Sequence, residues 1–454
     1  MKKLKSFWIF ISILEIFIFL CAPVYGLTIK EEEKLGNEFL SQIKRQVTLI
    51  SDPMILQYIR DVGSRIIECL PNQLFQFKFY ILYEKSVNAF AVPGGHIFIN
   101  SGLLEIMETE EELAAILAHE MTHVICRHIS ERLDQAKLTN IATLAGVIAG
   151  IMLGGEAGSA ITLGSIAAGQ TYELSYSREN EREADQNGLR YLTEAGYSAL
   201  GMINILKKMR KQDWLNVAQV PTYILTHPVS EERIVAIDHF LESHPHLIQN
   251  SIAIDRNHFK KIKARLIALY GDIENQSKIQ KDVQEHPTDP YAHYSYGLFL
   301  ARTGKRKEAI THLKTVLKYK AFDQDILRDL AHVYYSEGVY DAALSTLESV
   351  FALHPNDMKI FFMIGRCHVE LAHYSEAIQI FHKIMDTYPD YPNIKYYLGH
   401  VYGKVGDLGN SHYYIGCFYK HEGNNRSAKF HLNQALIHDK SNRKSEIEDM
   451  LKTL

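Results

Sequence analysis

The stretch that decides the fold reads Ala114-Ala115-Ile116-Leu117-Ala118-His119-Glu120-Met121-Thr122-His123-Val124. At 3.6 residues per turn, His119 and His123 lie one turn apart on the same face of a helix, so both imidazoles can reach one cation, with Glu120 beside them. This H-E-x-x-H spacing suits zinc, and a third protein ligand would leave the fourth coordination position for a water molecule. We expect Glu120 to take the proton as that water attacks a carbonyl polarised by the metal.

The same helix has a predicted start, because Thr109 with Glu112 forms the pattern of a capping box. The alternative is a buried helix that carries two ordinary histidines, since the pattern is short and the chain has 22 histidines. A third ligand is needed to decide between the two interpretations.

The candidate for that ligand lies in a second predicted helix, which opens with Ser177-Arg178-Glu179-Asn180-Glu181-Arg182-Glu183-Ala184-Asp185. Glu181 and Asp185 are four residues apart and share one face. We expect Glu181 to be the third ligand and Asp185 to accept the free ring N–H of a ligand histidine, which fixes its tautomer. The alternative is a solvated acidic face, which we would prefer if the first motif were absent.

A further histidine, His227, precedes Pro228 in a predicted turn before the next helix. It is either an ordinary surface residue or a group that enters the open position of the metal or binds the developing oxyanion.

The segments before the zinc helix predict two amphipathic helices, at 31–47 and 53–70, followed by a small sheet. Residues 75–81 alternate strictly and predict a half-buried strand, and residues 87–92 and 96–100 predict a hairpin across Pro93-Gly94-Gly95. A free edge of this sheet would let an extended substrate peptide add to it through main-chain hydrogen bonds. The alternative is a sheet that only covers the helix.

Residues 138–168 are small, apolar and rich in glycine, which predicts a helical hairpin. We expect either a lid or a surface that contacts membrane or unfolded substrate, or else two closely packed buried helices. Its apolar arm, 141–153, is too short to span a bilayer.

The N-terminal residues 1–26 predict a cleaved signal peptide, because Lys2, Lys3 and Lys5 precede an apolar run. An uncleaved anchor is the alternative. The remaining cysteines, Cys69, Cys126, Cys367 and Cys417, form no metal-clip pattern, so we expect either a Cys367–Cys417 bridge or buried free thiols. The net charge of −4 and the lack of a basic block argue against nucleic acid as a partner.

From about residue 255 a 34-residue repeat takes over. Gly297, Ala331, Gly365 and Gly399 keep this step, which is the spacing of tetratricopeptide helix pairs stacked into a solenoid. Gly416 restarts the pattern only 17 residues after Gly399. We therefore expect one helix near the end to serve as the second helix of one repeat and the first helix of the next.

With these motifs in this order, the chain resembles the zinc metalloproteases related to the CAAX prenyl protease and the bacterial heat-shock membrane protease, in particular the periplasmic members that carry C-terminal tetratricopeptides. The resemblance rests on residues 119–123, on Asn180-Glu181-Arg182-Glu183-Ala184-Asp185 and on Thr226-His227-Pro228. It implies an α+β, zincin-like metalloprotease domain at 27–250, mostly helical with a small sheet. An all-α tetratricopeptide solenoid at 255–454 follows.

The resemblance also implies one Zn²⁺ per chain, held by His119, His123 and Glu181, with Glu120 as general base and His227 as a displaceable fourth ligand. The implied partners are misassembled outer-membrane β-barrel proteins and their assembly machinery, in the periplasm, with peripheral membrane contact through 138–168. The competing hypotheses are a tetratricopeptide chaperone or adaptor with a silent or structural zinc site, and a membrane-anchored protease.

Overall fold

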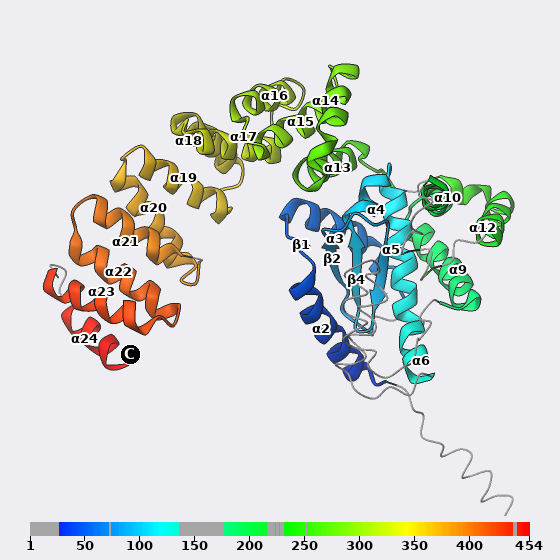
Figure 1. Cartoon of the computed structure of the whole chain (residues 1–454), viewed down its shortest axis with the longest axis horizontal. Helices are drawn as coiled ribbons and strands as arrows, with labels where there is room; N and C mark the ends of the chain where they lie inside the picture. The colour runs from blue at the N-terminus through cyan, green and yellow to red at the C-terminus, as the bar shows by residue number, and fades with distance from the viewer. Residues whose placement is uncertain are drawn as a thin grey trace, which may run out of the picture. The chain divides into compact units, whose positions relative to one another are not determined.

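The computed structural model describes residues 27–71, 74–135, 176–215, 223, 227, 231–249, 252–391, 393–438 and 443–454. The predicted signal peptide at 1–26 and the glycine-rich hairpin at 138–168 lie outside these ranges. The chain divides into two compact units, Met1–Leu266 and Ile267–Leu454 (Figure 1).

A four-stranded sheet lies at the centre of the first unit. Its spatial order is β1 (Leu49–Ile50), β2 (Lys78–Leu82), β4 (His96–Asn100) and β3 (Ala89–Val92). Strands β2 and β4 are parallel and the other pairs are antiparallel. The predicted hairpin is confirmed: Gly94 and Gly95 turn the chain at φ values of 84° and 83°, which glycine adopts without strain.

The strand predicted at 75–81 begins later than expected, at Lys78. Lys78 pairs with His96, the first residue of β4, and its N–H donates to the carbonyl of Gly95 at 2.9 Å. Residues 75–77 precede this first pair and would lie beside the turn before β4, which provides no strand residues for them to pair with. The alternating pattern could not show where the partner strand would start.

Helices cover both faces of the sheet (Figure 1). On one face, Phe39 of α2 (Ile29–Gln46) packs against Phe90 and Phe98, with ring centroids 6.0 and 5.3 Å away. On the other face lie α3 (Pro53–Ile67) and α5 (Glu110–Ile125). The first unit also contains α4 (Ser101–Ile106), α6 (His128–Gln135), α9 (Arg178–Glu194), α10 (Leu200–Leu215), α12 (Glu231–Ser243), η1 (Pro245–Ile248) and the start of α13 (Arg256–Tyr270).

The start of α5 is held by a buried polar cluster. Glu110 accepts hydrogen bonds from Tyr58 Oη at 2.5 Å and Tyr197 Oη at 2.9 Å, and pairs with Arg65 at 2.8 Å. Burial and the neighbouring Glu110 raise the pKa of Tyr58, so its hydroxyl remains a donor. The cluster fixes the first turn of the helix that carries both motif histidines.

The capping box predicted at the same place is only half right. The Thr109 hydroxyl accepts from the N–H of Glu112 at 3.4 Å, as expected. The Glu112 carboxylate instead accepts from the N–H of Glu108 at 2.8 Å and binds Lys208. A basic side chain from a distant helix therefore takes part in the cap.

The second unit is all helical, and the predicted tetratricopeptide stack is confirmed (Figure 1). Its elements are η2 (Ile273–Asn275), α14 (Gln276–Glu285), α15 (Pro290–Arg302), α16 (Arg306–Tyr319), α17 (Gln324–Glu337), α18 (Tyr340–Leu353), α19 (Met358–Glu370), α20 (Tyr374–Thr387), α21 (Ile394–Lys404), α22 (Leu408–His421), α23 (Asn425–His438) and α24 (Lys444–Lys452).

The repeated glycines mark close helix contacts. A Cβ on Gly297 would stand 3.1 Å from Leu313, and one on Gly365 would stand 2.5 Å from Phe381. In these two helix pairs, the glycine of the first helix therefore packs directly against a large side chain of the second helix.

The half-period shift is also present in the structure. Helix α22 places Ile415 against Gly399 of α21, while its own Gly416 receives Leu432 of α23. The same helix thus closes one pair and opens the next, as the 17-residue step predicted.

Two further expectations concern cysteines and membranes. Cys69, Cys126, Cys367 and Cys417 are all free thiols, so the bridge alternative is wrong. The alternative of buried free thiols holds for Cys367 alone, because the other three cysteines are only partly buried. Among the described residues, no helix combines the length and the apolar character needed to cross a membrane.

Candidate metal centre

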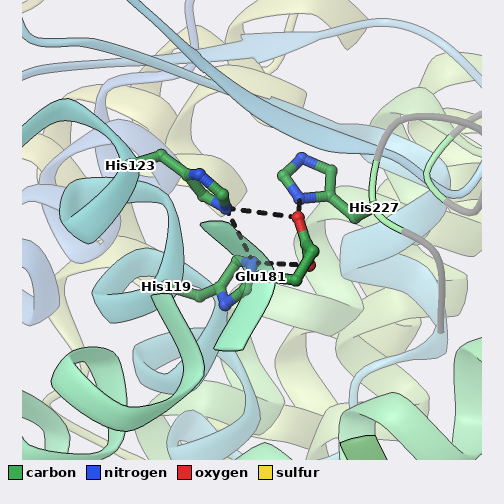
Figure 2. Close-up of side chains that lie close together, drawn as sticks. All are labelled: His119, His123, Glu181 and His227. Atoms are coloured by element: carbon green, nitrogen blue, oxygen red, sulfur yellow. Dashed lines mark hydrogen bonds and ion pairs between the residues drawn. The ribbon is translucent and has the colours of Figure 1, made fainter. Parts of the chain in front are cut away.

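Four predicted ligand side chains converge on one point in the first unit (Figure 2). His119 and His123 come from α5, Glu181 comes from α9, and His227 comes from the segment before α12. One donor atom from each lies within 4.8 Å of the others, and each residue is at most 1% exposed. The structure therefore brings together residues that are up to 108 positions apart in the sequence.

The donor set fits a zinc ion. The Nε2 atoms of His119 and His123 face each other at 3.1 Å. The Glu181 carboxylate lies 3.6 Å from the first of these nitrogens and 3.5 Å from the second. Two imidazole nitrogens and a carboxylate oxygen are the ligands of many catalytic zinc sites.

His227 adds a fourth donor on the open side of this group. Its Nδ1 lies 2.9 Å from Glu181 Oε1, and its Nε2 lies 3.7 Å from Glu120 Oε1. Tyr223 stacks on its ring at a centroid distance of 4.5 Å. The predicted surface alternative for His227 is wrong, because the side chain is 0% exposed.

Glu120 lies beside the donors without a hydrogen-bond partner. It is 0% exposed, and within the described chain neither carboxylate oxygen makes a hydrogen bond. Burial raises the pKa of its carboxyl group, against the opposing effect of His227 and His119. A buried carboxylate with so few polar contacts, of which His227 at 3.7 Å is one, costs folding free energy, so its presence indicates a functional role.

Asp185 orients the ring of His119 from the Nδ1 side, away from the other donors. The Oδ1 atom of Asp185 lies 3.2 Å from His119 Nδ1, on the opposite side of the ring from the donors. Arg233 of α12 binds both oxygens of Asp185 at 2.7 Å and reaches Glu181 at 2.6 Å. Although burial acts to raise it, Arg233 holds the pKa of Asp185 below its usual value. The Asp185 carboxylate is therefore kept charged at ion-pair distance from the ring nitrogen.

The ring of His123 has a different partner. Its Nδ1 lies 2.9 Å from Nδ1 of His128, whose Nε2 lies 3.3 Å from the carboxylate of Glu183. The roles of His128 and Arg233 were not predicted from the sequence. The only signal for His128 was its place five residues after His123, and Arg233 had none, because its contact depends on how α12 packs against α9.

Gly188 determines how closely α9 can approach α5. A Cβ at this position would stand 3.2 Å from the Cα of His119 and 3.3 Å from its nitrogen. Gly188 lies on the same face of α9 as Glu181 and Asp185, seven and three residues further along. The missing side chain therefore lets both carboxylates reach the histidines.

A free edge for an extended substrate peptide was one of two interpretations of the sheet, and among the described residues β3 does not expose such an edge. Strand β3 does stand at the end of the strand order, next to α5. All four of its residues, Ala89–Val92, are 0% exposed. The structure agrees with the alternative, in which the sheet covers the zinc helix.

Comparisons with protein families match both halves of the chain. Residues 56–241 match the model described as peptidase family M48, and this range includes all four donors and Glu120. Residues 334–401 match the model described as tetratricopeptide repeat.

Several proteins similar in sequence to this chain are named as proteases. The β-barrel assembly-enhancing protease of Yersinia pestis is 27% identical over 377 residues, covering 81% of this chain and 76% of that protein. The protein of the same name from Escherichia coli (strain K12) is 29% identical over 254 residues, covering 55% of this chain and 51% of that protein. Metalloprotease LoiP of the same strain is 26% identical over 210 residues, covering 46% of this chain and 80% of that protein. The chain thus spans about half the length of one of these relatives and about three quarters or more of the other two.

Proposed function

Since this chain is a metalloendopeptidase that joins a peptidase M48 domain to tetratricopeptide repeats, we propose that it acts in the bacterial periplasm on unfolded or misassembled outer-membrane proteins. The enzyme degrades them or assists their maturation, and zinc is its metal. The observation that carries the proposal is the convergence of His119, His123 and Glu181 beside the unpartnered carboxylate of Glu120. Relatives named β-barrel assembly-enhancing proteases support the choice of substrate.

The metal ligands in this proposal are Nε2 of His119, Nε2 of His123 and the carboxylate of Glu181, with one zinc per chain. When bound, zinc polarises the scissile carbonyl and makes a water molecule easier to deprotonate. Asp185 holds the His119 ring with Nδ1–H directed away from the metal, which leaves Nε2 free to coordinate. Asp185 is therefore a positioning residue.

Glu120 is the general base. Its carboxylate is fully buried beside the ligands and makes no hydrogen bond within the described chain, so it is free to accept a proton. A pKa raised by burial strengthens it as a base. After accepting the proton from the attacking water, the same carboxyl group returns it to the departing amine, so that one side chain serves both halves of the hydrolysis.

His227 keeps the enzyme latent. Its buried ring lies 2.9 Å from Glu181 and stacks on Tyr223, which places a nitrogen donor among the ligands. A fourth protein donor occupies the position that water or a substrate carbonyl needs. Displacement of His227 by a docked substrate or partner then starts catalysis.

The test is the change Glu120→Gln, which keeps the shape of the side chain and removes the base. The variant should bind zinc as the parent does but should not cleave an unfolded β-barrel polypeptide, as followed by gel electrophoresis together with metal analysis. The control is Glu242→Gln in α12, because the Glu242 side chain is 78% exposed and is not among the proposed ligands. Digestion by Glu120→Gln at the parental rate would overturn the assignment.

The repeats are the docking site for clients and for the outer-membrane assembly machinery. Tetratricopeptide stacks generally bind proteins, and this chain devotes its whole second unit to one. Residues 138–168 provide peripheral contact with a membrane. Fractionation of the cell envelope, with and without salt washing, tests the location and distinguishes it from a membrane-anchored protease.

The same repeats also favour a second function, that of a chaperone or adaptor that needs no cleavage. The two functions differ in cells that lack the gene and are complemented with Glu120→Gln. Full restoration of outer-membrane protein assembly would favour the adaptor, whereas accumulation of undegraded clients would favour the protease.

A further inference from the structure

A second cluster of metal-binding side chains lies at the C-terminal end of α5, next to the candidate zinc site. Cys126 ends α5 and His128 opens α6, with Arg127 between them in the left-handed conformation at φ 56°. This turn directs both side chains toward Glu183 of α9. None of these three side chains belongs to the ligand set of the first site.

The distances within this cluster suit a single cation. Cys126 Sγ lies 3.4 Å from one oxygen of Glu183, and His128 Nε2 lies 3.3 Å from the other. One donor atom from each residue lies within 4.8 Å of the others, the same limit that the first site meets. Thiolate sulfur, imidazole nitrogen and carboxylate oxygen together match the ligand preferences of zinc and similar divalent cations.

The cluster is buried on its His128 side and exposed to solvent on its Glu183 side. His128 is 2% exposed, whereas the Glu183 side chain is 53% exposed and Cys126 is half-buried. A cation can therefore enter from solvent, and water can complete its coordination shell. The four donors of the first site, by contrast, are all buried.

The two sites share a chemical connection. Nδ1 of His128 lies 2.9 Å from Nδ1 of His123, a ligand of the first site in the proposed function. Only one hydrogen fits between these nitrogens. When Nε2 of His123 binds a metal, this hydrogen lies on Nδ1 of His123, and Nδ1 of His128 accepts it. Occupation of the second site thus acts on the orientation and basicity of a first-site ligand.

We propose that Cys126 Sγ, His128 Nε2 and the Glu183 carboxylate form a second, weaker site for a zinc-like divalent cation, linked to the first site through the His123–His128 contact. Without a cation, the thiol and the imidazole N–H donate hydrogen bonds to Glu183. Binding of the cation releases two protons to solvent, one from the Cys126 thiol and one from Nε2 of His128. Because His128 Nδ1 remains the acceptor of the hydrogen on His123, the His128 ring binds as an imidazolate, and the cost of this deprotonation makes the second site the weaker one.

Cobalt titration of the metal-free, full-length protein distinguishes the two sites. The first site has no sulfur ligand, so the first equivalent of Co²⁺ should give only visible d–d absorption. The second equivalent should add a near-ultraviolet band from charge transfer between a thiolate and cobalt. Equilibrium dialysis with Zn²⁺ should show a second bound ion with lower affinity.

Matched variants assign the band. Cys126→Ser should lose both the charge-transfer band and the second equivalent, while Cys69→Ser, which changes a cysteine outside the cluster, should keep them. Glu183→Gln should weaken the second equivalent by about tenfold or more. The d–d absorption of the first equivalent shows in each case that the variant is folded.

Two results would overturn the proposal. One is a second equivalent without a thiolate band, and the other is a thiolate band that persists in Cys126→Ser. Either result would mean that the three side chains form only a hydrogen-bonded cluster.

Discussion

Gly188 of α9 lies directly against His119 of α5, because a Cβ at Gly188 would stand only 3.2 Å from the His119 Cα. The change Gly188→Val should push α9 away from α5 and move Glu181 and Asp185 out of reach of the histidines. We expect the zinc affinity to fall by about tenfold or more and the first unit to lose about 1–3 kcal/mol of stability. Competition with a chromophoric chelator measures the first effect.

The control for this prediction is Gln186→Val, which places the same side chain on the exposed face of α9. It should leave the zinc affinity unchanged. Equal losses in the two variants would show that helix propensity, and not the close approach to His119, governs the site.

His227 should restrain the enzyme. His227→Ala removes the fourth donor, so basal cleavage of an unfolded polypeptide should rise several-fold while the zinc content stays the same. The comparison is His239→Ala, whose side chain is 83% exposed on α12. Unchanged or lower cleavage by His227→Ala would count against latency and would leave the ring with an oxyanion-binding or structural role.

His96 should make the first unit sensitive to acid. Burial and the nearby Lys78 lower its pKa to about 4, from 6.5. Since the folded state holds this proton less tightly than the unfolded state, the contribution to stability is complete above pH 6.5 and is lost as the pH falls toward 4. Between pH 7.5 and pH 5 the loss should be about 2 kcal/mol.

The measurement compares the parent with His96→Gln, both metal-free, by hydrogen exchange in peptides that cover β4 and α2. The glutamine variant is less stable at pH 7.5, because it loses the stacking of His96 on Tyr80. The gap between the two proteins should shrink by about 2 kcal/mol at pH 5. A gap that stays constant with pH would show that His96 does not titrate in this range.

The backbone conformation of Ala372 should strain the repeats, and a change to glycine should relieve that strain. It adopts φ 60° at the position where Gly304, Gly338 and Gly406 adopt φ values of 80–86° in the neighbouring pairs. The left-handed conformation costs an alanine about 1 kcal/mol relative to glycine. Ala372→Gly should therefore raise the stability of the second unit, by up to about 1 kcal/mol.

The reciprocal change, Gly338→Ala, tests the same cause. A Cβ at Gly338 would meet no atom within 4 Å, so only backbone strain can act. Thermal unfolding should show a lower melting temperature for this variant and a higher one for Ala372→Gly. Shifts in the same direction would rule out the left-handed conformation as the cause.

Local periodicity was enough to predict most helices and the two pairs of site residues that each share one helix. His119 and His123 are one turn apart on one helix, as are Glu181 and Asp185 on another, so each pair follows from helix geometry alone. The 34-residue step predicted the stack in the same way, because each repeat contacts mainly its neighbours.

The features that sequence could not predict depend on packing between distant segments. Arg233 joins Glu181 to Asp185 only because α12 lies against α9, and Lys208 enters the cap of α5 from α10. The burial of β3 has the same origin, since an alternating pattern does not reveal what will cover an edge. The late start of β2 was set by the end of its partner strand.

Helix α22 has a consequence for how such an array can lengthen. Its Ile415 packs against Gly399 of α21, and its Gly416 packs against Leu432 of α23. The same large-on-glycine contact therefore occurs on both sides of the helix. An array that repeats this large-on-glycine contact can be extended by a single helix and still bury its packing faces. Such an array can therefore contain an odd number of helices as well as an even number.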